Sequence, residues 1–187
     1  MCVVGIILFA ITFQSFAQAP MVSVQEGGKK PNTMEKAKIP TQVMATHIKE
    51  CPLPTTMNEY WYGYPDFTNE SDWYGYNYDL YSNVNPSYYI VTLFKDQKNC
   101  RIMYAKNGKK VATHRSYTSV LPLAIAKAIQ AGNYKNWDMT GENEEIFKDK
   151  DSDQLKIYKV VVQKGTEKYA LFYMADGRFL KENKIKL

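Results

Sequence analysis

Apolar and polar residues alternate most regularly in the last third of the chain. Residues 156–163 place Tyr or Val at every second position, as a strand with one buried face does. Two further strands are predicted at residues 168–175 and 178–183. Asp176-Gly177 lies between these two strands and favours a tight hairpin, because both central residues of a type I′ turn need positive φ. This part of the chain is therefore predicted to form an antiparallel meander.

The same pattern occurs 69 positions earlier in the chain. Residues 87–115 align with residues 156–184 without a gap, and Asn107-Gly108 stands where the later copy has Asp176-Gly177. A unit that recurs in this way is one supersecondary block, whose apolar face is covered by a neighbour.

A helix is predicted ahead of each set of strands. The first runs from about Ile39 to Lys49 and stops at a proline-containing segment, since proline cannot continue a helix. The second begins after Thr118 or Ser119 as its cap and carries a proline in its first turn. It ends at Gly132. In both helices the apolar residues form a stripe along one face.

These elements predict an α+β fold. A helix followed by a four-stranded antiparallel meander occurs twice, which gives a sheet of about eight strands with both helices packed on one face. Repeat 1 covers residues 39–118 and repeat 2 covers residues 119–187. Residues 18–38 contain Gly, Lys and Pro without an apolar period, so a flexible leader is expected there.

The first 17 residues, MCVVGIILFAITFQSFA, carry no charge and contain a continuous apolar core. Ser15 and Ala17 stand at positions −3 and −1 of a cut before Gln18. This pattern indicates a secretory signal peptide that is too short to span a membrane. We therefore expect a periplasmic or secreted protein, with no membrane insertion of the mature chain.

The charge of the chain is modest and evenly spread. Lys and Arg total 24 against 19 Asp and Glu, so the net charge is +5, and no basic block stands out. A nucleic-acid-binding protein concentrates basic residues on one face. Nucleic acid is therefore not expected as a partner.

Two cysteines remain after the predicted signal peptide, Cys51 and Cys100. An exported protein can hold a disulfide. A bridge between them would close a loop of about 50 residues and contribute roughly 4 kcal/mol in the chain-entropy model. The alternative is two buried thiols, because the sequence does not give the Cα separation that a bridge requires.

Repeat 1 carries 13 extra residues between its helix and its second strand. The helix openings are 82 positions apart, whereas the strands are 69 apart. The extra length lies in residues 58–81, NEYWYGYPDFTNESDWYGYNYDLY, which hold ten aromatic residues, against 14% aromatic residues in the whole chain. An enrichment of this size predicts a specific role for the insertion.

Two roles are open for this insertion. If it is extended, Tyr60, Tyr62 and Tyr64 share one face, and Tyr74, Tyr76 and Tyr78 share another. The tryptophans would pack inward while the tyrosines point outward and bind a protein, or a glycan as the alternative. In the other interpretation, the insertion folds back and fills the open face of the sheet. The candidate partner-binding residues are Tyr60, Trp61, Tyr62, Tyr64, Trp73, Tyr74, Tyr76 and Tyr78.

Catalytic and metal-binding patterns are not evident in the sequence. His47 and His114 are the only histidines, and each is expected to be a surface or boundary residue. Asp149, Asp151 and Asp153 resemble the start of a calcium loop, but the required Gly and Glu are missing from it. We expect no catalytic residue, no metal and no cofactor, and an enzyme is the least supported class.

Three features of the sequence carry a resemblance to a known family. They are the helix openings Ile39-Pro40 and Leu121-Pro122, the paired segments YAKNGKKVATHR and YMADGRFLKENK, and the stretch AIQAGNYKNW. Over residues 39–187 the chain resembles the PepSY-like, beta-lactamase-inhibitor-like family of exported bacterial proteins. The resemblance implies tandem repeats, a helix-covered sheet face and a free concave face. It also implies protein binding or restraint of an enzyme. The expected function is thus an exported, non-catalytic binding protein, with a carbohydrate-binding module as the alternative.

Overall fold

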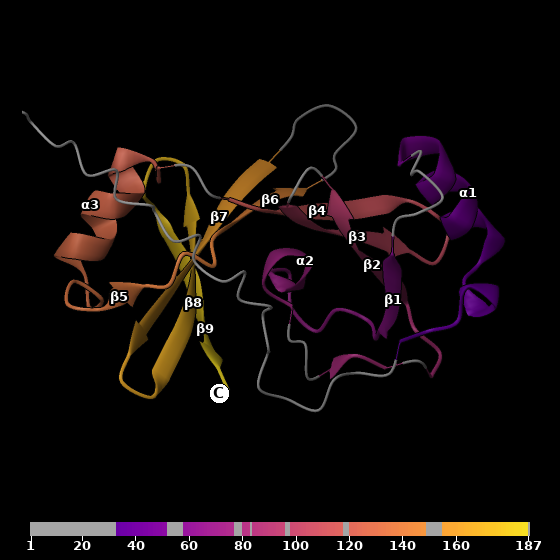
Figure 1. Cartoon of the computed structure of the whole chain (residues 1–187), viewed down its shortest axis with the longest axis horizontal. Helices are drawn as coiled ribbons and strands as arrows, with labels where there is room; N and C mark the ends of the chain where they lie inside the picture. Colours follow the sequence, from indigo (N-terminus) through magenta and orange to yellow (C-terminus); the bar gives the residue numbers. More distant parts are fainter. Residues whose placement is uncertain are drawn as a thin grey trace, which may run out of the picture.

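Strand pairing joins both halves of the chain into one antiparallel sheet (Figure 1). The computed structural model describes residues 33–51, 58–76, 80–82, 84–95, 98–117, 120–148 and 155–186. The strands are β1 (Glu59–Tyr64), β2 (Tyr88–Lys95), β3 (Lys98–Ala105), β4 (Lys110–Ser116), β5 (Asp138–Met139), β6 (Glu144–Lys148), β7 (Leu155–Lys164), β8 (Glu167–Met174) and β9 (Phe179–Ile185). The helices are the 3-10 turn η1 (Lys36–Lys38), α1 (Thr41–Glu50), α2 (Asp72–Gly75) and α3 (Leu123–Ala131).

The order of strands in the sheet is β1-β2-β3-β4-β6-β7-β8-β9, and the two-residue β5 pairs with β7 beside this path. The predicted α+β class is confirmed, and the nine strands found in the described residues exceed the predicted eight because of β5. The halves of the chain meet where β4 pairs with β6, from Ala112 opposite Lys148 to Ser116 opposite Glu144.

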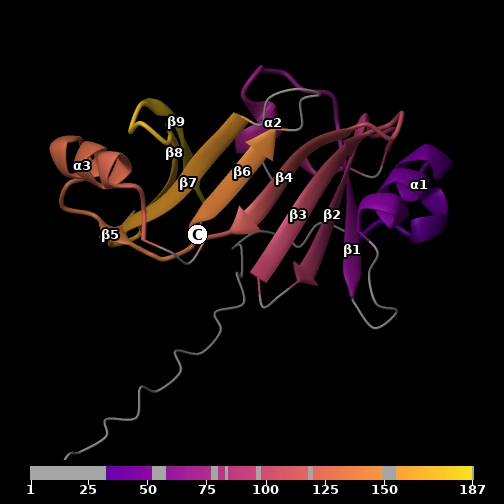
Figure 2. The same ribbon diagram turned by 90° about the horizontal axis from the view of Figure 1, so that it is seen from above.

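Helices α1 and α3 pack against the same face of the sheet. Ile102 under α1 pairs with Thr113, and Thr113 pairs with Phe147. Phe147 pairs with Lys156, which lies two positions before Tyr158 under α3. Paired residues and alternate residues of one strand share a face, so the predicted placement of both helices on one face is confirmed. Figure 2 shows the two helices at opposite ends of the molecule, with the strands between them.

Each helix covers its own buried apolar cluster. The cluster under α1 comprises Met34, Ile39, Val43, Trp61, Tyr89, Val91, Leu93, Ile102 and Tyr104. The cluster under α3 comprises Ile125, Ile129, Tyr158, Val160, Val162, Leu171 and Tyr173. Among the helices of the described residues, none combines the length and the apolar character needed to cross a bilayer.

The helix starts differ from the prediction in one respect. Pro40 and Pro122 are the N-cap residues of α1 and α3, with φ −56° and −50° and extended ψ values. Thr118 and Ser119, the predicted caps, lie outside the described residues. Proline suits a helix start because its fixed φ needs no ordering and its missing N–H would have no partner there. Gly132 is the C-cap of α3, as predicted.

The end of the predicted flexible leader belongs to the fold. Met34 is buried, and its N–H donates to the carbonyl of Trp61 at 2.7 Å, so it extends the edge of the sheet beside β1. The prediction of a flexible leader up to residue 38 is therefore wrong for residues 33–38. The predicted signal peptide and the first part of the predicted leader, residues 1–32, lie outside the described residues.

The two predicted Gly-containing hairpins are confirmed, and each also touches a helix. Gly108 and Gly177 have φ +86° and +88°, the left-handed conformation that favours glycine. A Cβ at Gly108 would lie 2.6 Å from the carbonyl oxygen of Gln42, and a Cβ at Gly177 would lie 2.6 Å from that of Ala124. Each hairpin thus packs against the first turn of the helix in its own half of the chain.

Replacing Gly177 with alanine is expected to destabilise the protein by about 2–3 kcal/mol, as the sum of left-handed strain and a contact that forces the hairpin away from α3. Gly165→Ala is the matched control, because Gly165 also has positive φ (+59°) but has nothing within 4 Å of the position that its Cβ would take. The control is expected to lose only about 1 kcal/mol. Urea unfolding of both variants measures the difference, and equal losses would contradict a close hairpin–helix contact.

Candidate protein-binding face

The first three tyrosines of the insertion share one face of β1, as predicted. β1 pairs with β2 from Glu59 opposite Leu93 to Tyr64 opposite Tyr88, so its side chains alternate between the two faces. Trp61 points under α1 and is 1% exposed, as expected for an inward tryptophan. Tyr60 and Tyr64 lie on the opposite face together with Tyr62. This opposite face of the sheet is called the arm face, after the segment of residues 65–76, the arm, that packs on it.

Only part of this row of tyrosines reaches solvent. Tyr60 is 50% exposed, whereas Tyr64 is 1% exposed and belongs to a buried cluster with Tyr76, Ile90 and Met103. The expectation that the tyrosines point outward is therefore wrong for Tyr64. The reason is that the chain after β1 turns back over the sheet and covers this position.

The chain after β1, residues 65–76, is called the arm. It contains the single-turn helix α2, which Figure 1 shows near the middle of the molecule. The carboxylate of Asp72 accepts hydrogen bonds from the N–H groups of Thr68 and Asn69, at 2.8 and 3.0 Å, and from the Thr68 hydroxyl at 3.1 Å. Burial acts to raise the pKa of Asp72, but these hydrogen bonds outweigh it and hold the pKa below its usual value. Asp72 thereby closes the turn that starts α2.

The arm packs its aromatic side chains onto the sheet. Trp73 is 5% exposed and belongs to a buried cluster with Ala112, Ile146, Ile157 and Phe172. Members of this cluster come from β4, β6, β7 and β8, so a residue of the first half is buried on strands of the second. The free face that the resemblance implied is thus occupied in its middle by the arm.

The second row of predicted binding tyrosines is not an extended row. Tyr74 lies within α2 and Tyr76 directly follows it, while Tyr78 lies outside the described residues. Tyr76 is buried, with its ring centroid 5.2 Å from that of His114. Tyr74 is half-buried, 5.4 Å from Phe172, and burial raises its pKa. The prediction of outward side chains is therefore wrong for Tyr76.

Polar contacts hold the backbone of the arm and its Ser71 hydroxyl. Lys181 of β9 donates to the Ser71 hydroxyl at 3.0 Å and to the Gly75 carbonyl at 3.2 Å. Asn183, also of β9, donates to the same Gly75 carbonyl at 3.0 Å. A Cβ at Gly75 would lie 2.8 Å from the Lys181 side chain, so glycine permits this close approach. Burial lowers the pKa of Lys181, and Asp72 acts in the opposite direction.

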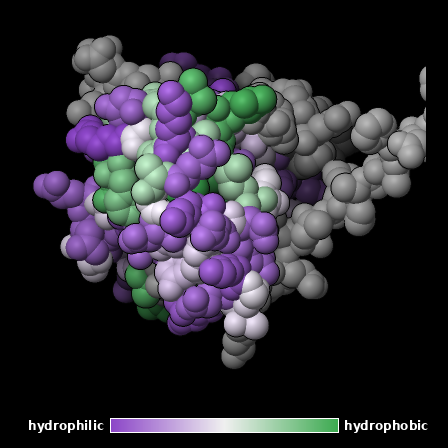
Figure 3. Space-filling model, turned by 90° about the vertical axis from the view of Figure 1, so that its left-hand side faces the viewer, coloured by the Kyte–Doolittle hydropathy of each residue, from purple (hydrophilic) through white to green (hydrophobic). Residues whose placement is uncertain are grey.

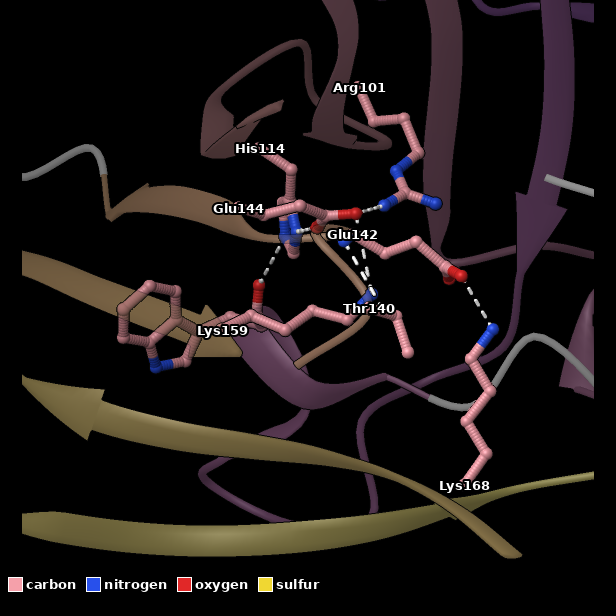
Figure 4. A network of polar contacts seen from close by, with 8 residues as sticks. Arg101, His114, Thr140, Glu142, Glu144, Lys159 and Lys168 are labelled. Atoms are coloured by element: carbon pink, nitrogen blue, oxygen red, sulfur yellow. Dashed lines mark hydrogen bonds and ion pairs between the residues drawn. The ribbon is translucent and has the colours of Figure 1, made fainter. Parts of the chain in front are cut away.

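A charged network lies beside the arm at the junction of the two halves (Figure 4). The carboxylate of Glu144 in β6 accepts a hydrogen bond from Arg101 of β3 and one from Lys159 of β7 at 3.3 Å. The side chains of Arg101, Glu144 and Lys159 are between 12% and 17% exposed. Burial acts to raise the pKa of Glu144, but the two cations and the His114 contact hold it well below its usual range. A second pair, Lys168 with Glu142 at 2.6 Å, adjoins this network.

His114 connects the network to the arm. Its Nδ1 lies 3.3 Å from Glu144 and its Nε2 lies 3.3 Å from the carbonyl oxygen of Trp73. Burial lowers the pKa of His114, although Glu144 acts to raise it. A neutral imidazole has a single N–H, so it donates to one of these two acceptors at a time. The ring thus packs between arm and sheet as a structural link.

The other histidine has an equally buried position on the helix face. His47 of α1 lies 3.1 Å from the Tyr104 hydroxyl through Nδ1 and 2.9 Å from Glu59 through Nε2. Burial of Glu59 acts to raise its pKa, but hydrogen bonds from Lys36, His47 and Trp61 lower it overall. The sequence-based expectation of surface or boundary histidines is wrong for both, since His47 and His114 are buried.

Two buried ionisable groups are each held in one protonation state. Glu144 is surrounded by cations and a histidine, which suits a permanent charge rather than a proton carrier. The Tyr104 hydroxyl is buried, and burial raises its pKa further from neutrality. Within the described residues, no group of three or more His, Cys, Asp or Glu side chains could hold a metal ion.

Solvent-accessible aromatic rings of the insertion lie on the arm face of β1. The rings of Tyr62 and Tyr81 stack with centroids 4.9 Å apart and planes 12° apart. Tyr60 and Leu80, which is 45% exposed, are the exposed large hydrophobic residues of this part of the chain. Viewed from the α3 end, in contrast, hydrophobic residues form separate patches among hydrophilic ones (Figure 3). Leu123 and Met139 are exposed residues of the C-terminal half.

The two cysteines lie on the helix face, away from the arm. Both are half-buried and pack against the cluster under α1. A bond between them stays a prediction.

Comparison with known proteins gives a likeness of fold. No protein-family model matches the chain, and no curated protein does. A crystal structure described as periplasmic, from Bacteroides eggerthii, has a TM-score of 0.55 at 13% identity, over 79% of this chain and 90% of that one. A DUF2874 family protein from Bacteroides ovatus has a TM-score of 0.53 at 18% identity, over 84% and 90%.

A BLIP-like protein from Bacteroides fragilis has a TM-score of 0.50 at 16% identity, over 86% of this chain and 91% of that one. The beta-lactamase-inhibitor-like part of the resemblance is thus supported at the level of fold, and the PepSY-like part stays a prediction. Identities this low show shared architecture only. The chain therefore has the α+β fold of these BLIP-like and DUF2874 structures.

Proposed function

We propose that the protein is an exported, non-catalytic binding protein that contacts another protein through its arm face. A secreted or periplasmic enzyme that it restrains is the partner class we favour. The predicted signal peptide supports export, as does the periplasmic description of a structural neighbour. The BLIP-like fold supports a non-catalytic role, by analogy of fold alone.

One observation carries this proposal: the arm is held in place before any partner arrives. Side chains from β4 and β9 bind its backbone, and Trp73 anchors it in a cluster shared with β6, β7 and β8. A surface that is already in its bound shape loses little conformational entropy on binding. Tyrosines suit such a surface because they offer a large contact area with few rotatable bonds.

Seven of the eight predicted binding residues lie in the described part of the chain and differ in burial, whereas Tyr78 lies outside it. Tyr60, Tyr62 and Tyr74 keep exposed surface and are the proposed contact residues, with Tyr81 added from the stack on Tyr62. The buried members support the surface from beneath: these are Trp61, Tyr64, Trp73 and Tyr76.

We also propose that the two halves are copies of one helix-plus-strands unit. Gly108 meets α1 and Gly177 meets α3 at positions that keep the 82- and 69-residue offsets of the sequence alignment. The same offsets relate Val43 to Ile125 and Tyr104 to Tyr173, in the two clusters under the helices. Matching contacts on this scale support one structural unit used twice.

The binding proposal is tested by affinity capture from exported proteins of the source organism. The test variant is Tyr60→Ser/Tyr62→Ser/Tyr81→Ser, which removes accessible rings from the arm face. The matched control is Leu123→Ser/Met139→Ser, which removes exposed apolar side chains from the C-terminal half. The partner is expected to be lost by the first variant and kept by the second. Equal capture by both folded variants would refute the site.

A glycan remains the alternative partner for the exposed rings. Replacement of Trp61 or Trp73 cannot test it directly, because both side chains are buried and cannot stack on a sugar. The glycan alternative therefore depends on Tyr60 and Tyr62. A glycan array probed with the wild type and the triple tyrosine variant separates it from protein binding.

A further inference from the structure

Cys51 and Cys100 border the same buried cluster, the one under α1. Cys51 is the C-cap residue of α1, where its N–H donates to the carbonyl of His47 at 2.8 Å. Cys100 lies in β3 opposite Leu93, on the strand face that also carries Ile102 and Tyr104. Both cysteines are half-buried and pack against the cluster under α1.

Tyr104 provides a common reference point for the two cysteines. His47, one helical turn before Cys51, lies 3.1 Å from the Tyr104 hydroxyl. Burial is the main cause of the raised pKa of Tyr104, and Cys51 and Cys100 both add to it. Tyr104 belongs to the cluster against which both cysteines pack, one from the end of α1 and the other from β3.

The C-terminal half contains positions equivalent to the end of α1 and to Cys100, and these equivalent positions lie close together. Tyr169 aligns with Cys100, and their strand registers agree: Cys100 pairs with Leu93, and Tyr169 pairs with Val162. The chain just beyond α3 reaches Tyr169, with the Tyr134 ring 5.8 Å away between centroids. Trp137 follows at 5.5 Å from Tyr169.

The corresponding positions in the N-terminal half are the end of α1 and Cys100 of β3. By the 82-residue offset of the helix openings, Cys51 aligns with Asn133, the residue before Tyr134. The C-terminal half thus closes its helix end onto the second strand of its meander with three aromatic rings. The N-terminal half has a cysteine at the helix end and a cysteine on the strand.

We propose that Cys51 and Cys100 form an intramolecular disulfide that ties the end of α1 to β3. The reaction needs an oxidant that carries a disulfide, either a thiol–disulfide oxidoreductase or oxidised glutathione. The thiolate of one cysteine attacks a sulfur of the oxidant, forms a mixed disulfide and releases one thiol. The second thiolate then attacks that mixed disulfide, so that one S–S bond forms, one is cleaved, and the oxidant leaves as two thiols.

This inference rests on the export part of the proposed function and not on protein binding. An oxidising compartment favours the bridge, whereas cytosolic reductants would keep the thiols. Closing a loop of about 50 residues restricts the unfolded chain, so the bridge is expected to lower the unfolding equilibrium constant on the order of 1,000-fold. It would fasten one end of α1, the helix that carries His47 and covers Tyr104.

The test is thiol labelling of the full-length protein exported into a bacterial periplasm. The protein is denatured, treated with iodoacetamide with and without prior reduction, and weighed by intact-mass spectrometry. We expect no label without reduction and labelling of both Cys51 and Cys100 after it, with a peptide map showing the two joined within one chain. Export is read separately, from cleavage of the signal peptide in the same mass.

Two labels on the cleaved, exported chain before reduction, persisting after incubation with oxidised glutathione, would overturn the proposal. A map showing bridges between different chains would do the same. The Cys51→Ser/Cys100→Ser variant is the matched control for stability: reductant should lower the denaturation midpoint of the wild type and leave that of the variant unchanged. Loss of partner capture by the tyrosine variant has no bearing on either readout, so the two proposals can fail independently.

Discussion

Replacing Trp73 with alanine is expected to lower the free energy of unfolding by about 3–5 kcal/mol, as for other buried Trp side chains. The indole packs in a cluster built from Ala112, Ile146, Ile157 and Phe172, so its removal leaves a cavity between the arm and the sheet. Lys148 also lies over the indole ring, with its Nζ 4.9 Å from the centroid. Urea unfolding measures the loss, and amide exchange should show α2 opening before the strands.

The control for Trp73→Ala is Tyr60→Ala, which removes a ring of the same insertion that is half exposed. It is expected to change stability by less than about 1 kcal/mol, since much of its apolar surface is already in water. If both variants unfolded with the same midpoint, Trp73 would not be an anchor. The arm would then have to be held by its polar contacts alone.

Replacing Glu144 with glutamine is expected to cost about 3 kcal/mol, because Arg101 and Lys159 would lose their shared counter-charge in a mostly buried place. Glu142→Gln is the matched control, since Glu142 pairs with Lys168 and its side chain is 30% exposed. The control should lose less than about 1 kcal/mol, as exposed ion pairs do. Equal losses would show that burial does not set the strength of this network.

The free energy of unfolding should fall in two steps as the pH is lowered, and these two descents have different origins. The pKa of His114 is lowered in the fold from an ordinary 6.5, so the unfolded chain binds a proton first and stability falls as pH drops below about 6.5. The pKa of Glu144 is lowered from an ordinary 4.5, so its contribution is present above that pH and is lost as pH falls below it. Thermal unfolding midpoints measured across this pH range check both descents. Glu144→Gln should make the second descent smaller, leaving the part that comes from Asp72 and Glu59, and should keep the first.

The regular parts of the fold were predictable because local chemistry decides them. Asn107-Gly108 and Asp176-Gly177 specify hairpins through their positive φ, and the alternation around them specifies which side chains face the helices. The turn residues, the apolar–polar alternation and the sequence repeat all predicted the same strands and hairpins. The prolines that open both helices were visible too, although their role as N-caps was not.

The arm was only half predictable. Ten aromatic residues in the insertion signalled burial or binding, and the structure shows that part of the insertion is buried. Its conformation was missed, because Asp72 closes a helical turn with Thr68 and Asn69 where alternation indicated a strand. The place where the arm docks depends on Lys181 and Asn183, more than 100 residues further along the chain, which no local pattern reveals.

The charged network and the two histidines were missed for a related reason. Arg101, His114, Glu144 and Lys159 come from four different strands, and only the register of the sheet brings them together. A usable signal was present once strands were assigned: a carboxylate and a cation on the inward face of predicted central strands must have partners.

The hydrogen bonds from β9 to Gly75 have a consequence for the order of folding. β9 is the last strand of the chain, so the arm can reach its final position only after the C-terminal residues have been made and paired with β8. Contacts between residues so distant in sequence form late and slow the final step. Until then Trp73 and its neighbours remain in water, and chaperones that bind nascent chains would find their target in that stretch.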